Sequence, residues 1–148
     1  MKTPEKVVNH IVSWLKDYQE SSQMKGFVVG VSGGIDSAVT STLCAMTGAP
    51  VLCLEMSIHQ EENQVSRALD HIEWLESNYK NVKHHSLSLT PIFESFVDGL
   101  PPTDEKEQQL HSLANTRARL RMSTLYYFAA LHNYLVAGTG NKVCLLYT

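Results

Sequence analysis

A short segment near the start of the chain, residues 27–37 (FVVGVSGGIDS), constrains the fold more than any other part of the sequence. Its first five residues are rich in aromatic and β-branched side chains, which predicts a buried strand over residues 27–31. Gly33 and Gly34 follow, and because they lack Cβ atoms they let the backbone turn sharply with positive φ angles. A helix is expected from about Asp36 onward. The segment therefore predicts a strand, a tight turn and a helix in immediate succession.

Such a strand, turn and helix form a cradle for phosphate. The unpaired N–H groups of the first helical turn and the helix dipole favour an anion at this point, and the glycines let it approach the main chain. Ser32 and Ser37 add hydroxyl donors. Asp36 would repel a phosphate unless a divalent cation such as Mg²⁺ lies between them. We therefore expect a metal–nucleotide complex at this loop, with Asp36 as the metal ligand.

Other glycine-rich loops fit this segment less well. A Walker A loop requires a lysine that is absent here, and the dinucleotide pattern G-x-G-x-x-G is not present. Residues 30–34 do match the nucleophile elbow G-x-S-x-G, which would make Ser32 the nucleophile of a serine hydrolase. The elbow explains neither Asp36 nor Ser37, and it requires an acid and a histidine on a larger sheet. The hydrolase stays open as an alternative, as does a glycine turn that serves only the backbone geometry.

Residues 32–37 (SGGIDS) resemble the S-G-G-x-D-S pyrophosphate loop of the N-type ATP pyrophosphatases. Members of that superfamily cleave ATP between its α and β phosphates. The resemblance implies that ATP binds to the loop and to the end of the strand before it. The implied ATP-binding residues are Gly30, Val31, Ser32, Gly33, Gly34, Ile35, Asp36 and Ser37.

Two later segments, residues 115–122 (NTRARLRM) and 136–142 (VAGTGNK), narrow the resemblance. Together with the loop they resemble the ammonia-dependent NAD synthetases, over roughly residues 7–143. The resemblance implies that Arg119 binds deamido-NAD and that Thr139 binds ATP. It also implies that ammonia amidates deamido-NAD to NAD through an adenylated intermediate, with release of AMP and pyrophosphate and with Mg²⁺ as cofactor. Family members are homodimers, so the arginine-bearing helix is the expected interface, with the deamido-NAD site at that interface.

The sequence departs from this family near its end. The family has a glutamate that helps hold Mg²⁺ five residues after the threonine, and this position is Cys144 here. We therefore expect residues 1–148 to form a single incomplete ATP-pyrophosphatase domain with an aberrant tail at 144–148, so that the sheet is truncated after its fourth strand. An inactive nucleotide-binding fragment of a synthetase is accordingly the alternative to an active enzyme.

Composition excludes several other classes of protein. The chain has 148 residues, 43% of them apolar, and a net charge of -3, which suit one domain and give no basic patch for nucleic acid. No signal peptide or apolar run of membrane-spanning length is present, so a cytoplasmic protein without membrane contact is expected. The three cysteines have no C-x-x-C spacing and predict neither disulfides nor a zinc site.

Helical and strand patterns alternate along the chain. A helix is expected from Pro4, with Thr3 as N-cap. The strands expected after it cover residues 27–31, 51–55, 82–87 and 134–137, with helices at about 36–46, 65–75, 90–99 and 104–132. This alternation predicts an α/β fold, an open parallel sheet with helices on both faces that is Rossmann-like. The resemblance implies the adenine nucleotide alpha hydrolase-like version of that fold.

Apolar spacing also predicts which helical residues face inward. The expected inward residues are Val7, Ile11, Leu15 and Tyr18 in the first helix, Val39, Leu43 and Met46 in the second, Val65, Ala68, Leu69, Ile72 and Leu75 in the third, and Ala114, Ala118, Met122, Leu125 and Ala129 in the longest.

The positions of the motifs in this fold predict where ligands bind. Ligands of open parallel sheets bind beyond the carboxyl ends of the strands, so Thr139 is expected near the phosphate loop. Arg117 and Arg121 lie one helical turn apart and share a face, which we expect to be solvated, whereas Arg119 projects from another face.

Overall fold

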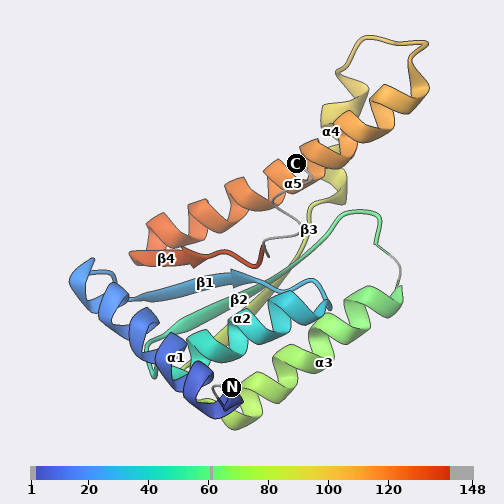
Figure 1. The fold of residues 1–148 in the computed structure, drawn as a ribbon. Coiled ribbons are helices and arrows are strands. Elements are labelled where there is room, and N and C mark those ends of the chain that lie inside the picture. The colour runs from blue at the N-terminus through green and yellow to red at the C-terminus, as the bar shows by residue number, and fades with distance from the viewer. Residues whose placement is uncertain (1–2, 61, 141–148) are drawn as a thin grey trace.

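The computed structural model describes residues 3–60 and 62–140, which form five helices and four strands (Figure 1). In chain order they are α1 (Pro4–Ser21), β1 (Gly26–Gly30), α2 (Ile35–Met46), β2 (Val51–Ser57), α3 (Glu62–Asn78), β3 (Val82–Ser88), α4 (Thr90–Asp98), α5 (Lys106–His132) and β4 (Tyr134–Ala137). Every predicted element is present. The tail at 144–148, including Cys144, lies outside the described residues.

The four strands form one parallel sheet in the order β3-β2-β1-β4. Helices α1, α2 and α3 cover one face of this sheet, and α5 lies across the other face (Figure 1). The prediction of an α/β fold with an open parallel sheet and helices on both faces is therefore confirmed. Within the described residues the sheet ends after the fourth strand, at β4 on one edge and β3 on the other.

Alternate residues of β1 supply the two hydrophobic cores. Phe27 and Val29 point to the α2 and α3 side, where Ile72 and Leu75 of α3 pack against them. Val28 points to the opposite side, towards Ala129 of α5. All of these side chains are buried. A strand that is apolar on both faces is typical of a parallel sheet covered on both sides.

The inward face of α2 differs from the prediction. Val39 and Met46 are exposed, whereas the buried residues of α2 are Ser37, Ser41, Cys44 and Ala45. Small side chains face the sheet, and two of them are serines whose hydroxyl groups bond to carbonyl oxygens of their own helix. The apolar spacing predicted that large residues of α2 face inward. In the structure α2 packs closely on the sheet, and small residues face inward instead.

The inward faces of three other helices also differ in part. No residue of α1 is buried, and Val7 and Tyr18 are exposed. Leu69 of α3 is exposed, while its neighbours Ala68, Ile72 and Leu75 are buried as predicted. In α5 the side chains that pack on the core are Leu113, Leu120, Leu125, Phe128 and Ala129, so only the carboxyl part of the predicted stripe is correct.

The chain reverses direction across the sheet at β1. From β1 it moves through β2 to β3, and it then returns through α4 and α5 to β4 on the other side of β1. The loops that leave β1 and β4 therefore diverge at a topological switch point, where open α/β sheets bind their ligands.

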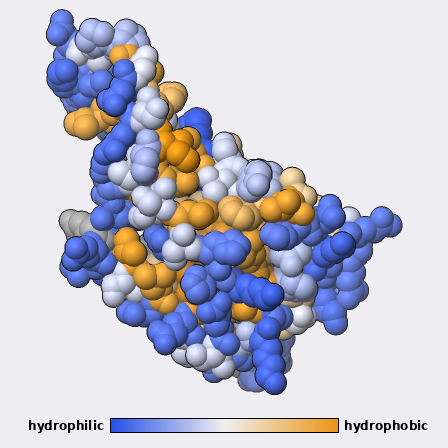
Figure 2. Space-filling model, turned by 180° about the vertical axis from the view of Figure 1, so that it is seen from behind, coloured by the Kyte–Doolittle hydropathy of each residue, from blue (hydrophilic) through white to orange (hydrophobic). Residues whose placement is uncertain are grey.

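The beginning of α5 and the loop before it project beyond the sheet (Figure 1). Seen from the opposite side, apolar surface gathers in the middle of the molecule below this projection (Figure 2). The exposed large apolar residues of α4, α5 and the loop between them are Ile92, Phe96, Leu100, Leu110, Met122, Tyr126, Tyr127 and Leu131. Among the helices of residues 3–60 and 62–140, none combines the length and the apolar character needed to cross a membrane.

Candidate phosphate-binding site

The loop between β1 and α2 has the tight turn that the sequence predicts. Val31 is buried, and its N–H donates to the carbonyl oxygen of Leu54 in β2 at 2.9 Å. Gly33 has a φ of 77°, in the left-handed region that favours glycine. A Cβ atom on Gly33 would lie 2.6 Å from the carbonyl oxygen of Gln64 in α3. Glycine is therefore required here both for its φ angle and for the close approach of α3.

Two serines brace this turn from within. Ser37 is buried, and its hydroxyl donates to the carbonyl oxygen of Gly34 at 2.9 Å. The same oxygen accepts the N–H of Ser32 at 3.2 Å and lies 3.3 Å from Ser32 Oγ. Since its hydrogen is already used, Ser37 holds the loop in shape, whereas Ser32 is exposed to solvent at the mouth of the loop.

The amino end of α2 is open to an anion. Its N-cap is Gly34, which has no side chain that could cap the first-turn N–H groups. Ile35 and Asp36 in this first turn are both exposed. Uncapped N–H groups and the positive end of the helix dipole attract phosphate.

The phosphate loop lines a cavity that the carboxyl ends of three strands share. The cavity has a volume of about 290 Å³. Its lining residues are Gly30, Val31, Ser32, Met56, Gln60, Ala118, Arg121, Met122, Leu125 and Thr139. The structure thus brings Thr139, which follows β4, to the loop that follows β1, as the sequence predicts. Met56, Gln60 and the residues of α5 in this lining were not predicted as site residues.

Arg121 is the cationic side chain of this cavity, and its predicted place on a solvated face is wrong. It is half-buried, and its Nε donates to the carbonyl oxygen of Met56 at 3.0 Å. Burial lowers the pKa of Arg121, and so does the positive charge of Arg117, while Glu55 opposes this shift. Arg117 is half-buried as well, with its guanidinium 5.4 Å from the ring centroid of Phe93.

Arg119 does not line the cavity in the single chain. Its side chain is exposed, and its Nη1 donates to the carbonyl oxygen of Asn115 one turn earlier in α5 at 3.2 Å. The structure therefore places Arg119 on a different face of α5 from Arg121, as the helical spacing predicts.

Glu55 is a buried acid near the carboxyl end of β2, with 5% of its surface exposed. Burial raises the pKa of Glu55, and the positive charge of Arg121 partly opposes this rise. No sequence pattern marked Glu55 or Arg121 as a pair, because one lies in a strand and the other in a helix 66 residues later.

The geometry does not favour Ser32 as a hydrolase nucleophile. Its hydroxyl contacts Ser37, and the histidine nearest along this hydrogen-bonded path, His71, bonds to Ser41 instead.

A metal site made of three or more protein side chains is not found in the part of the chain that the structure describes. Two adjacent histidines of β3 point to opposite faces of the sheet: His84 bonds to Glu76 of α3, and His85 contacts Phe128 of α5.

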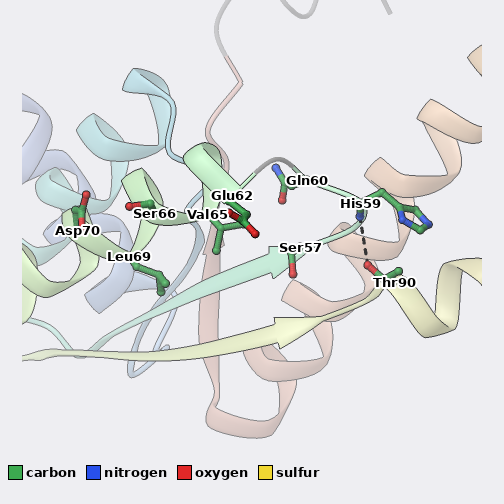
Figure 3. A pocket seen from close by; sticks show the side chains of 9 residues that line it. All are labelled: Ser57, His59, Gln60, Glu62, Val65, Ser66, Leu69, Asp70 and Thr90. Atoms are coloured by element: carbon green, nitrogen blue, oxygen red, sulfur yellow. Dashed lines mark hydrogen bonds between the residues drawn. The ribbon is translucent and has the colours of Figure 1, made fainter.

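A second cavity lies beyond the carboxyl ends of β2 and β3, between α3 and α4 (Figure 3). It has a volume of about 500 Å³, and the N–H of His59 donates to Thr90 Oγ1 at its edge at 3.2 Å. Glu62 and Asp70 also line it. Two carboxylates disfavour a phosphate group, so the cavity of about 290 Å³ lined by Ser32 and Thr139 is the better candidate for a phosphate site.

Comparison with known proteins places this geometry in context. Residues 7–147 match the family model described as NAD synthase. The chain is 34% identical over 144 residues to the NH(3)-dependent NAD(+) synthetase of Carboxydothermus hydrogenoformans, covering 93% of this chain and 55% of that protein. It is 38% identical over 141 residues to the protein of the same name from Methanocaldococcus jannaschii, covering 93% of this chain and 52% of that protein. The chain thus spans about half the length of the curated relatives it matches.

Solved structures agree with these sequence matches. The NH3-dependent NAD synthetase of Campylobacter jejuni superimposes with a TM-score of 0.82 at 33% identity, covering 96% of this chain and 58% of that one. The NMN synthetase of Francisella tularensis superimposes with a TM-score of 0.81 at 34% identity, covering 95% of this chain and 56% of that one.

Proposed function

The chain belongs to the NAD synthase family, and on that premise we propose that it supplies the ATP-binding part of an ammonia-dependent NAD synthetase. The resemblance read from the sequence is confirmed by the family match. The proposed reaction adenylates the carboxylate of deamido-NAD with ATP, and ammonia then displaces AMP. The observation that carries the proposal is that Ser32, in the loop after β1 and two residues before the glycine N-cap of α2, lines one cavity together with Thr139, which follows β4.

In this proposal the loop binds the phosphates of ATP. The N–H groups at the start of α2 donate to the phosphate oxygens, and Ser32 adds a hydroxyl from the mouth of the loop. Thr139 approaches from the other side of the cavity. Because these donors are fixed before ATP arrives, they stabilise the departing pyrophosphate by position and by charge.

Asp36 fits the role of a magnesium ligand. Its carboxylate is exposed in the first turn of α2, within the loop where the phosphates would bind. Mg²⁺ in nucleotide sites is held by one or two carboxylates together with substrate phosphates, so a cluster of three protein ligands is not required. When bound, the ion neutralises charge on the phosphates and on the pyrophosphate leaving group.

The rest of the cavity fits the nucleoside portion of ATP. Met56, Met122 and Leu125 give apolar walls, and Gln60 gives an amide that can bond to a base or ribose. Arg121 adds positive charge from α5. A volume of about 290 Å³ is at the lower end of the range for small-molecule sites.

We further propose that α5 forms a homodimer interface and that Arg119 binds deamido-NAD there. The support is the exposed surface of α5, which includes the large side chains of Tyr126, Tyr127 and Leu131 at 59–64% exposure. Arg119 is exposed on the same helix, so a ligand at the interface can reach it.

The direct test supplies the purified chain with ATP, Mg²⁺, ammonium and deamido-NAD, and measures AMP and NAD by chromatography. Parallel reactions replace deamido-NAD by nicotinate mononucleotide, because one of the similar structures is an NMN synthetase. We expect AMP and the amidated product in equal amounts, and loss of both in Asp36→Asn. Binding of Mg·ATP without turnover would instead support the inactive nucleotide-binding fragment. Absence of both binding and turnover in the folded chain would contradict the proposal.

A further inference from the structure

We propose that His71 of α3 is a positioning residue for the phosphate loop: through Ser41 it fixes the first turns of α2 and thereby the geometry of the loop. The proposal rests on the proposed function only in taking this loop as the nucleotide site. His71 belongs to no recognised sequence motif. It is distant from the loop in the sequence and lies near it only in the folded chain.

A continuous path of polar contacts joins His71 to the loop. His71 Nε2 lies 2.9 Å from Ser41 Oγ, and Ser41 Oγ lies 2.8 Å from the carbonyl oxygen of Ser37. Ser37 Oγ in turn contacts the N–H of Ser32 and the carbonyl oxygen of Gly34, at 3.2 and 2.9 Å. The path therefore runs from α3 through the buried face of α2 to the glycine turn.

The carbonyl oxygens around Ser41 favour one direction for the first bond. A serine hydroxyl has one hydrogen, and that of Ser41 is directed to the carbonyl oxygens of Ser37 and Ala38, at 2.8 and 3.1 Å. With that hydrogen on a carbonyl oxygen, the Ser41 oxygen accepts from His71 in the tautomer that carries its hydrogen on Nε2, which is the tautomer that we assign. A side chain without a donor at this position would leave the buried Ser41 oxygen without this bond.

A second contact from the same helix supports the loop directly. The turn at Gly33 approaches α3 so closely that a Cβ there would lie 2.6 Å from Gln64 O and 3.3 Å from Arg67 Cβ. Arg67 and His71 are four residues apart, so they lie on one face of α3. Helix α3 therefore holds the glycine turn at one point and the first turns of α2 at another.

Packing keeps the ring of His71 in place. The ring stacks on that of Trp74, with centroids 5.9 Å apart and an angle of 22° between the planes. His71 also lines a cavity of about 330 Å³ together with Gly33, Gly34 and Ala38, on the α3 side of the loop. A side chain held in this way fixes the residue that it bonds, which is how supporting residues orient a binding site.

Three variants separate positioning from a general role in stability. His71→Phe keeps a ring that can stack on Trp74 but removes the N–H donor. His71→Gln restores an N–H donor on a side chain of similar reach, and Ser41→Ala removes the acceptor. Each protein is first shown to be folded by circular dichroism and urea unfolding, and its Mg·ATP dissociation constant is then measured by calorimetry.

We expect His71→Phe and Ser41→Ala to weaken Mg·ATP binding by about five- to tenfold, the size of one hydrogen bond, with no further loss when they are combined. The Mg·ATP dissociation constant of His71→Gln should stay within about twofold of that of the unchanged chain, because glutamine keeps an N–H donor. Folded His71→Phe protein with unchanged Mg·ATP affinity would overturn the proposal. So would an equal loss of affinity in His71→Gln.

A nucleotide-free measurement distinguishes this proposal from the proposed function. Amide hydrogen exchange followed by nuclear magnetic resonance reports the N–H of Ser32, which donates to Ser37 in the free loop. Faster exchange at Ser32 in His71→Phe, and recovery in His71→Gln, would support the positioning role even in a chain that bound no nucleotide. Failure of Mg·ATP binding in the unchanged chain would then count against the proposed function alone, whereas unchanged exchange at Ser32 would count against His71.

Discussion

The phosphate loop and helix α5 lie on opposite sides of the same cavity, yet they are held in different ways. The loop is surrounded by the chain itself: Val31 is buried, Ser37 is buried and bonded, and Gly33 packs on α3. Helix α5 touches the core with one stripe, while large apolar side chains such as Leu110 and Tyr127 remain 68% and 64% exposed.

This difference shows which parts of the proposed site one chain can complete. The shape of the loop proposed to bind phosphate depends on contacts between β1, α2 and α3. The other wall depends on α5, whose exposed surface is typical of a helix that packs against another molecule. We therefore expect changes in the loop to act on folding and nucleotide binding, and changes on exposed α5 to act on association.

The largest effect is expected from Gly33→Ala. The new Cβ would meet the carbonyl oxygen of Gln64 at 2.6 Å on a residue with a φ of 77°. We expect the free energy of unfolding to fall by about 2 kcal/mol or more and Mg·ATP binding to be lost. Urea unfolding and calorimetry measure the two quantities.

Gly48→Ala is the matched control for this change. Gly48 has nearly the same φ, 80°, but a Cβ there would meet nothing within 4 Å. The free energy of unfolding of Gly48→Ala should fall by only about 1 kcal/mol, the cost of an alanine in the left-handed region. Its affinity for Mg·ATP should not change. Equal losses in the two variants would show that α3 does not hold the loop.

A charged residue on the exposed face of α5 should weaken homodimer formation without changing nucleotide binding at the loop. We expect Tyr127→Glu to weaken a homodimer by at least tenfold, because it buries a charge in an apolar interface, and to leave the Mg·ATP affinity of the chain unchanged. Analytical ultracentrifugation measures the dissociation constant. Trp14→Glu, at an aromatic residue of α1 that is 57% exposed, is the control and should leave association unchanged. A monomeric unchanged chain would contradict the interface proposal.

The smallest effect is expected at Glu55, where β2 and α5 interact through Arg121. Because the pKa of Glu55 is raised in the folded chain, the folded state holds this proton more tightly than the unfolded state does. The contribution of Glu55 to stability is therefore highest below about pH 4.5 and falls as the pH rises through the folded pKa.

Glu55→Gln removes this dependence on pH. We expect it to raise the free energy of unfolding at pH 7 and to flatten its dependence on pH between pH 4.5 and neutrality. Urea unfolding as a function of pH tests this. A large loss of stability in Glu55→Gln would instead mean that the Glu55–Arg121 interaction outweighs the cost of burial.

The secondary structure could be predicted from the sequence because it depends mainly on residues that are close together in the chain. Residues 134–137 were predicted as a strand with the observed bounds, and α2 begins one residue earlier than predicted. Strand β2 extends to Ser57, two residues past its predicted end, because Met56 and Ser57 pair with Leu87 and Ser88 of β3. Pairing between strands is not visible in a single segment.

Only part of the candidate site could be predicted from the sequence, because only part of it lies in one continuous segment. Glycines, serines and Asp36 form one continuous loop, so their chemistry can be read together. Arg121 was placed on a solvated face because helical spacing shows which residues share a face but not which face meets the sheet. His71 and Ser41 meet across 30 residues, and only the fold brings them together.

The most direct test of the account is a calorimetric titration of the chain with ATP, with and without Mg²⁺, for the unchanged sequence and for Asp36→Asn. The account predicts one ATP bound per chain, with Mg²⁺ required and with affinity reduced at least about tenfold in Asp36→Asn, equivalent to about 1.4 kcal/mol. Urea unfolding of Asp36→Asn shows that any loss of affinity is measured on a folded chain. Folded chain that binds no ATP, or binds it equally well without Mg²⁺ and without Asp36, would contradict the assignment of this loop as the nucleotide site.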